Sequence, residues 1–187
     1  MVSPFIWVIT GCLIFFLLFW IISSFRVKKN NNRGNRNSTI RLLLFVFISF
    51  FFSPQNLQEI IGIHLFSSSL FVQGVGVLAC VVGVAFAIWA RIYLSTNWGM
   101  PMSQKENPEL VITGPYHFVR HPIYTGICLA MLGSAITGGM AWFIWFIFFS
   151  IWFIYSAKKE EKYMQQRFPG QYIEYMKRTK MIVPYVL

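Results

Sequence analysis

Long apolar runs alternate with short polar segments along this chain. Residues 4–25 carry no charged side chain, and residues 70–90 form a second uncharged run that ends before Arg91. A helix over residues 4–25 rises about 33 Å, which is enough to cross the hydrocarbon core of a bilayer. The first run is also too long for the core of a signal peptide, so we expect it to be retained. Both runs predict transmembrane helices.

Two further apolar runs, 123–137 and 139–156, meet at Gly138 and Gly139. Glycine ends helices readily and permits a very tight turn, so two short-linked apolar runs are expected to lie antiparallel. This pattern predicts a helical hairpin near the C-terminal end of the chain.

A fifth segment, 40–63, is less regular. Its purely apolar part, 42–52, is short for a span, and Ser53 and Pro54 interrupt it. We expect a helix that kinks at Pro54, because proline removes a backbone hydrogen bond. With the four clear runs, this segment brings the predicted number of transmembrane helices to five.

Small residues recur at helical spacing within the run 70–90. They are Gly76, Cys80, Gly83 and Ala87. Small side chains let helix backbones approach closely inside a membrane, so we expect this face to pack against another helix.

The composition supports lipid as the main solvent. Of 187 residues, 56% are hydrophobic and only 12% are charged, whereas a soluble domain of this size needs a largely polar exterior. The three cysteines lie inside apolar runs without CxxC spacing, so neither a disulfide framework nor a zinc site is predicted. The expected fold class is an all-α integral membrane protein.

The positive charges fall on one side of this five-helix arrangement. With the N-terminus outside, the inner segments are 26–41, 91–121 and 157–187, and they contain all sixteen Lys and Arg residues. The positive-inside rule places these segments, and any site that they form, on the cytoplasmic side. Topology and attraction to anionic lipid explain the net charge of +10, so a nucleic acid partner is not expected.

The residues that can do chemistry are concentrated in the second half of the chain. Segments 91–121 and 157–187 hold five of the six acidic residues and two of the three histidines. We therefore divide the chain into two regions. Residues 1–94 are expected to form three transmembrane helices with a basic inner loop, and residues 95–187 are expected to form the catalytic region.

The sequence around Pro122 predicts a polar helix start. Proline fits the first turn of a helix, so we expect the helix to begin at Pro122 with His121 as its cap. The partial positive charge of that helix end, with Arg120 and His121 beside it, would attract a carboxylate or a phosphate. Tyr124 lies on the first turn and can face the same pocket.

The hairpin is expected to return Glu160 and Glu161 to the same place. The last apolar run ends on the inner side near Ser156, so these carboxylates should lie close to His121. A ligand that matches such a pocket carries both an anionic and a cationic group. Two alternatives remain: an interfacial Arg120–His121 pair that only orients its helix, and ion pairs of the glutamates with neighbouring lysines.

A resemblance to a known family rests on two polar strings. They are LVITGPYHFVRHPIYTG, residues 110–126, and EEKYMQQRFPGQYIEYMKR, residues 160–178, with the hairpin between them and Pro184 after them. Over about residues 104–185 the chain resembles the C-terminal half of the isoprenylcysteine carboxyl methyltransferase family and its phospholipid methyltransferase relatives.

This resemblance implies a membrane enzyme that transfers a methyl group from S-adenosylmethionine and releases S-adenosylhomocysteine. In that family the cofactor pocket is cytoplasmic and is built from the loop before the hairpin, the hairpin ends and the C-terminal segment. No metal ion is implied. Matching positions imply the following cofactor contacts: Gln104, Pro108, Glu109, Leu110, Val111, Tyr116, His121, Pro122, Ile123, Tyr124 and Glu160.

The acceptor is expected to be lipophilic, and a prenylcysteine carboxylate is the first candidate. An ionised carboxylate needs no general base, but a cation must orient it. Arg120 and Arg167 are the candidates, and Arg167 is favoured because it lies on the more open C-terminal segment. The family's substrate-orienting arginine is replaced by Ser156 in this chain. If the acceptor is a phospholipid amine instead, Glu161 is the nearest candidate base.

Two other classes remain open from the sequence. A membrane reductase acting on sterol-like double bonds would bind a nicotinamide cofactor, whose phosphates need more cations than Arg120 and Lys105 supply. A non-catalytic membrane scaffold would not explain the two polar inner segments. A doubly wound nucleotide-binding domain is not expected, because the inner segments are too short for its sheet. No oligomeric state is predicted.

Overall fold

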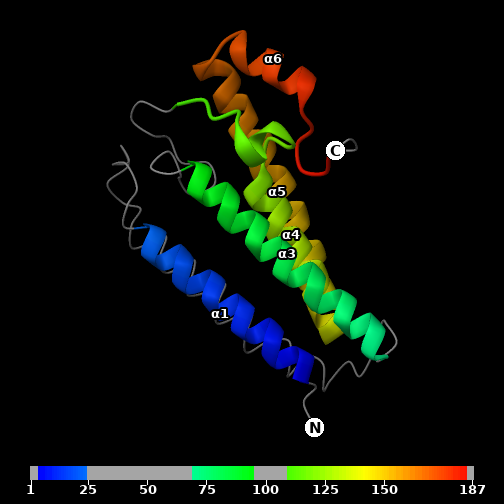
Figure 1. Ribbon diagram of the computed structural model, residues 1–187. Coiled ribbons are helices and arrows are strands. Elements are labelled where there is room, and N and C mark those ends of the chain that lie inside the picture. The colour runs from blue at the N-terminus through cyan, green and yellow to red at the C-terminus, as the bar shows by residue number, and fades with distance from the viewer. Residues whose placement is uncertain (1–3, 25–68, 95–108, 185–187) are drawn as a thin grey trace, which may run out of the picture.

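The computed structural model describes residues 4–24, 69–94 and 109–184 (Figure 1). These residues form α1 (Pro4–Ser24), α3 (Leu70–Leu94), the short 3-10 helix η2 (Gly114–His117), α4 (Pro122–Gly138), α5 (Met140–Arg167) and α6 (Gln171–Arg178). The described residues contain no β-strand and a single isolated β-bridge, between Val119 and Lys180. The all-α prediction is confirmed for this part of the chain.

Three of these helices, α1, α3 and α5, are long and apolar enough to cross a membrane. Their outward faces carry large apolar side chains, such as Trp7 at 67% exposure and Phe71 at 80%. Large exposed apolar surfaces of this kind mark contact with lipid rather than water. The predicted span at 40–63 lies outside the described residues, and the outer position of the N-terminus stays a prediction.

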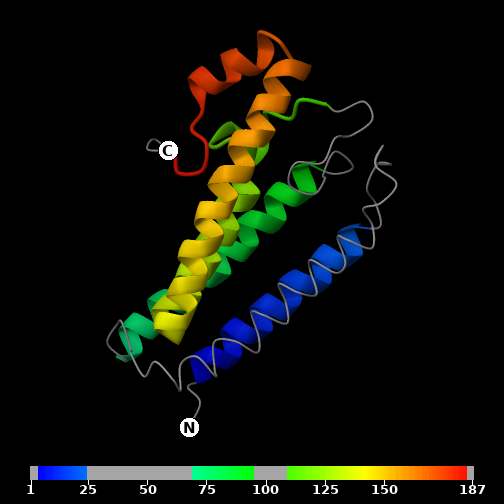
Figure 2. The same ribbon diagram turned by 180° about the vertical axis from the view of Figure 1, so that it is seen from behind.

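The helices α3, α4 and α5 lie side by side, and α1 lies along α3 (Figures 1 and 2). Both views place α6 beyond the end of α5, at the opposite end of the molecule from the N-terminus. The end of α3, the start of α4 and the end of α5 are therefore brought together near α6.

Small residues bring the backbones of α3 and α4 into direct contact. A Cβ atom added at Gly126 would lie 2.6 Å from the Ala87 nitrogen and 2.6 Å from the Gly83 oxygen, closer than real Cβ atoms approach. Gly76, Cys80, Gly83 and Ala87 are all buried. The predicted packing face is confirmed, and its partner is α4.

The predicted hairpin is confirmed. Gly139 joins α4 to α5 with a positive φ of 87°, a backbone conformation that favours glycine. The amide of Gly139 donates to the carbonyl of Ala135, which closes the last turn of α4. A single residue, Gly139, therefore joins the two antiparallel helices.

The last apolar helix is longer than its apolar run. The apolar run ends near Ser156, whereas α5 continues to Arg167. The added segment contains no proline or glycine and is rich in straight-chain residues that favour helix. The helix stops only at Phe168, before Pro169 and Gly170. A rigid helix, rather than a loop, therefore carries both glutamates.

A buried arginine ties α1 to the same end of the molecule. Arg91, near the end of α3, donates from Nη2 to the backbone carbonyl of Ser23 at 2.8 Å. The last carbonyls of a helix have no partner within it, and the helix dipole favours a cation there. Trp20 of α1 belongs to the same buried apolar cluster as Tyr116 and Tyr124. The first helix therefore helps to enclose the region around the start of α4.

Candidate functional site

The start of α4 has the predicted form, and the chain after α6 lies beside it. The helix begins at Pro122, with His121 as its N-cap. The amide of Arg120 donates to the carbonyl of Lys180 at 2.8 Å, and the amide of His121 donates to that of Met181 at 3.0 Å. These two amides precede the first turn of α4, so the chain after α6 is bound beside the helix start, and the free donors that we expected on the first turn stay a prediction.

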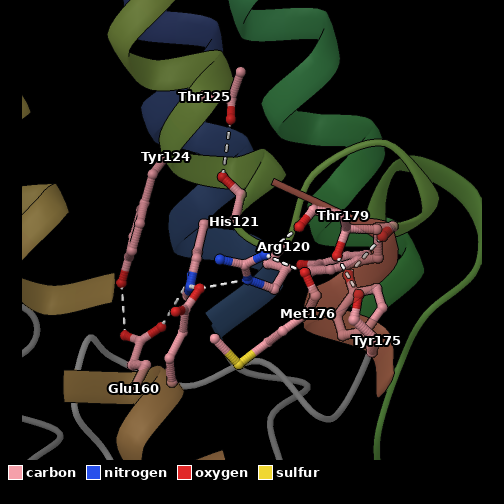
Figure 3. A network of polar contacts seen from close by, with 10 residues as sticks. Arg120, His121, Tyr124, Thr125, Glu160, Tyr175, Met176 and Thr179 are labelled. Carbon is pink, nitrogen blue, oxygen red and sulfur yellow. Dashed lines mark hydrogen bonds and ion pairs between the residues drawn. The ribbon is translucent and has the colours of Figure 1, made fainter. Parts of the chain in front are cut away.

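Two glutamates of α5 face the residues at the start of α4. Nδ1 of His121 lies 3.5 Å from Oε2 of Glu160, and Nε2 lies 3.4 Å from Oε1 of Glu161. Arg120 donates from Nε to Oε1 of Glu161 at 2.6 Å, and the Tyr124 hydroxyl donates to Oε1 of Glu160 at 2.6 Å. Tyr124 and His121 both point toward Glu160 in Figure 3. The predicted meeting of these residues is confirmed.

This cluster is largely withdrawn from water. The side chains of Arg120, His121 and Glu161 are 8%, 9% and 6% exposed, whereas that of Glu160 is 28% exposed. Charges in such surroundings are tolerated only when they are paired. With His121 protonated, two cations face two carboxylates. Glu160 is the member of the cluster most accessible to a ligand.

The two carboxylates favour the protonated form of His121. Burial by itself lowers the pKa of this imidazole, because a low dielectric disfavours charge. The neighbouring Glu160 and Glu161 outweigh burial and raise the pKa of His121 above its ordinary value of 6.5. The imidazole therefore remains a cation to a higher pH in the folded protein than in the unfolded chain.

We expect the free energy of unfolding to fall as the pH rises through the native pKa of His121. The native state holds the proton more tightly, so the contribution is complete below about pH 6.5 and is lost above the raised pKa. Thermal unfolding in detergent from about pH 5.5 to 9 measures this slope. His121→Asn should remove it, whereas His117→Asn, at an exposed imidazole, should keep it. An identical slope in His121→Asn would contradict the assignment.

An aromatic stack lies on the side of the cluster that faces the apolar parts of the helices. The rings of His121 and Tyr124 are parallel, with centroids 5.4 Å apart, and Tyr124 stacks on Phe153 at 4.7 Å. Trp20 and Tyr116 belong to the buried apolar cluster that includes Tyr124 and Phe153. These rings exclude water from one side of the charges, which strengthens the electrostatic interactions between them.

The other residues predicted from the sequence are distributed unevenly. Those that are buried are Tyr116, Pro122 and Ile123, those that are half-buried are Leu110 and Val111, and those that are exposed are Glu109 and Arg167. Gln104 and Pro108 lie outside the described residues. Arg167 ends α5 and stands apart from the paired charges, whereas Arg120 lies among them.

Sequence reasoning gave no role to three residues of this region, Phe153, Thr125 and Tyr175. Phe153 lies two helical turns before Glu160, so helical spacing could have placed it on the same face. Thr125 and Tyr175 bind backbone carbonyls distant in sequence, and no local pattern announces such bonds. The hydroxyl of Ser156 is buried and has no hydrogen-bond partner among the described residues.

The arrangement places both signs of charge close together. Cations come from the loop before α4, and carboxylates come from α5. A ligand that carries both an anionic and a cationic group would match such a set. Within the described ranges, no group of three or more His, Cys, Asp or Glu side chains is placed to hold a metal ion.

Comparison with known proteins finds relatives of this region. A model of a family described as phospholipid methyltransferase matches residues 71–171. The chain is 27% identical over 111 residues to the cobalt-zinc-cadmium resistance protein CzcN of Cupriavidus metallidurans, which covers 58% of this chain and 47% of that protein. It is 32% identical over 90 residues to protein-S-isoprenylcysteine O-methyltransferase B of Arabidopsis thaliana, which covers 44% of this chain and 43% of that protein. The chain therefore spans less than half the length of these two curated relatives.

Proposed function

Because the chain belongs to the phospholipid methyltransferase family, we propose that it uses S-adenosylmethionine to methylate a lipophilic acceptor at a membrane. The observation that carries this proposal is the cluster of His121, Tyr124, Glu160 and Glu161 where α4 and α5 meet. The cluster lies inside the residues that match the family. Its position at the ends of apolar helices gives a lipophilic acceptor a route through the bilayer.

The charges of the cluster fit those of S-adenosylmethionine. The methionine part of this cofactor carries a carboxylate and an ammonium group, and its ribose carries hydroxyls. Protonated His121 would hold the carboxylate, and Glu160 would accept hydrogen bonds from the ammonium group or the ribose. Tyr116 and Tyr124 would supply aromatic walls, in agreement with the cofactor contacts implied by the sequence.

The contribution of the chain to catalysis is alignment and exclusion of water. When bound, the cofactor supplies a methyl group on a positively charged sulfur, and that sulfur leaves as a neutral thioether when an acceptor attacks the methyl carbon in line. Glu160 is held by Tyr124 and lies beside His121, so these groups are oriented before a ligand arrives. The stacked rings of Tyr124 and Phe153 keep water from one side of the site.

We favour a carboxylate acceptor of the prenylcysteine type. Such a carboxylate is ionised near neutral pH and needs no general base. With this acceptor Glu161 need not act as a base, which agrees with the hydrogen bond that its Oε1 already accepts from Arg120. Arg167 remains the proposed cation that orients the acceptor. The name of the A. thaliana relative, an isoprenylcysteine O-methyltransferase, describes methylation of this kind of acceptor.

A phospholipid amine is the second candidate acceptor, and the description of the matching family favours it. An amine must lose a proton before it is methylated, and Glu161 is the proposed base. Because Oε1 of Glu161 accepts a hydrogen bond from Arg120, Oε2 of Glu161 would be the atom that takes the proton from the amine.

S-adenosylhomocysteine is expected to raise the thermal unfolding temperature of the purified protein in detergent. A ligand that binds only the folded state stabilises it by about 2.7 kcal/mol at 100 times its Kd. NADPH is expected to have no such effect. Stabilisation by NADPH without stabilisation by S-adenosylhomocysteine would overturn the proposal in favour of a reductase. Transfer of labelled methyl groups to a prenylcysteine or to an aminophospholipid then decides between the two acceptors.

A further inference from the structure

The chain after α6 is bound along its backbone to the start of α4. We call residues 179–182 the C-terminal strap. The carbonyl of every strap residue accepts a hydrogen bond from residues 120–125. The pairs are Thr179 with the Arg120 guanidinium, Lys180 with the Arg120 amide at 2.8 Å, Met181 with the His121 amide at 3.0 Å, and Ile182 with Thr125 Oγ1 at 2.6 Å. The strap therefore lies against the residues that lead into α4, beside the proposed cofactor site.

The helix that precedes the strap is short. It follows α6, a helix of eight residues in which Tyr172 and Tyr175 are buried. The turn before α6 contains Gly170 with a φ of 83°. The Tyr175 hydroxyl donates to the carbonyl of Tyr116 at 2.5 Å. Within the strap, Ile182 is 6% exposed and Met181 packs against the buried apolar cluster, so apolar contacts and the polar bonds attach it together. Small terminal elements open at lower free energy than the core of a protein.

Arg120 connects this strap to the charged cluster. Its Nε binds Oε1 of Glu161 at 2.6 Å, while Nη1 donates to the carbonyl of Thr179 and lies 3.4 Å from that of Met176. In Figure 3 its guanidinium group lies between the cluster and the residues at the end of α6. One planar side chain therefore joins α5 to the strap, at 8% exposure.

We infer that Arg120 is a positioning residue, not a substrate-binding one, and that it couples docking of the strap to cofactor binding. The strap fixes the backbone of His121, which is a proposed cofactor contact. A ligand held by His121 and Tyr116 favours the docked strap, and by linkage the docked strap favours the ligand to the same extent. The coupling rests on the proposed function, whereas the attachment of the strap by Arg120 does not.

Limited digestion with trypsin measures docking of the strap. Cleavage after Lys180, an exposed residue within the strap, releases a peptide that begins at Met181 and is identified by mass spectrometry. When opening is fast, the cleavage rate follows the population of the open state. We expect Arg120→Gln to accelerate this cleavage by about tenfold or more and to weaken S-adenosylhomocysteine binding by a similar factor. Saturating S-adenosylhomocysteine should slow the cleavage in the unmodified protein.

Two further variants leave the ion pair between Arg120 and Glu161 intact. Thr125→Val removes the side-chain bond to the Ile182 carbonyl, together with a contact to the His121 carbonyl in the preceding turn, and should accelerate cleavage after Lys180, but less than Arg120→Gln does. The matched control is Thr137→Val, the same change at the far end of α4, where the hydroxyl contacts the carbonyls of Gly133 in its own helix and of Gln73 in α3, far from the strap. Cleavage after Lys162, inside α5, reports global unfolding in every digest.

The outcomes separate this inference from the proposed function. If S-adenosylhomocysteine stabilises the protein but neither protects the strap nor binds more weakly to Arg120→Gln, the inference is wrong and the proposed function stands. Equal acceleration after Lys162 and Lys180 in both Arg120→Gln and Thr125→Val would also overturn it, because the effect would then be global. If the unmodified protein does not bind S-adenosylhomocysteine, the proposed function and the coupling both fail.

Discussion

Glu161→Ala is expected to lower the free energy of unfolding by about 3–5 kcal/mol, because it leaves a buried cation without its carboxylate. The Arg120 and Glu161 side chains are 8% and 6% exposed and share a hydrogen bond of 2.6 Å. Water cannot readily replace the lost partner at such a site. Thermal or denaturant unfolding of the purified protein in detergent measures the effect.

The matched control is Glu174→Ala on α6. Glu174 also pairs with two cations, Arg178 at 3.0 Å and Lys177 at 3.4 Å, but all three side chains are more than half exposed. Exposed ion pairs contribute little, so this variant should unfold almost like the unmodified protein. If Glu161→Ala is as stable as Glu174→Ala, the buried ion pair does not hold the start of α4 to α5.

Replacing both partners distinguishes an unpaired charge from lost packing. In Arg120→Met with Glu161→Met, no isolated charge is left, and apolar replacements of buried ion pairs are often close to neutral. We therefore expect the double variant to regain much of the stability lost in Glu161→Ala. It should still lack the contact between Arg120 and Thr179, so its strap should be cleaved faster.

Glu160→Gln is expected to raise the Kd of S-adenosylhomocysteine by about 10- to 100-fold, which corresponds to the loss of one hydrogen bond to a charged group. The amide oxygen of glutamine can still accept from the Tyr124 hydroxyl, so the fold should be preserved. The negative charge facing His121 and the ligand is lost. Calorimetric titration in detergent measures the change.

Two further variants test this assignment. Glu174→Gln makes the same chemical change on α6 and should leave the Kd unchanged. His121→Ala should also weaken binding strongly, since it removes the proposed partner of the ligand carboxylate. Retained binding in both Glu160→Gln and His121→Ala would show that the cofactor pocket lies elsewhere.

The sequence alone predicted the local features of the site well. Proline at the start of a helix and glycine at its end have strong steric preferences, so Pro122 and Gly139 marked the limits of α4. A hairpin of known limits then required Glu160 and Glu161 to return to His121, and they do. Helical spacing of small residues similarly revealed the face of α3 that packs on α4.

The sequence was less informative where local rules compete. The apolar run ends near Ser156, but helix propensity carries α5 on to Arg167. The end of an apolar run is the end of a span, not of a helix, because backbone hydrogen bonds continue in water. Apolar length therefore predicts the limits of a membrane span, whereas helix propensity predicts the limits of the helix.

The sequence by itself determined the class of protein, the hairpin and the meeting of two polar segments, because each follows from short-range sterics and from apolar length. Only the tertiary structure decided what those polar groups bind. Arg120 could be matched to a substrate or to a carboxylate from its position alone, and the fold assigns it to Glu161 and to the strap. Those partners lie 41 and 59 residues away and include a backbone carbonyl, a group that every residue carries and no sequence pattern distinguishes.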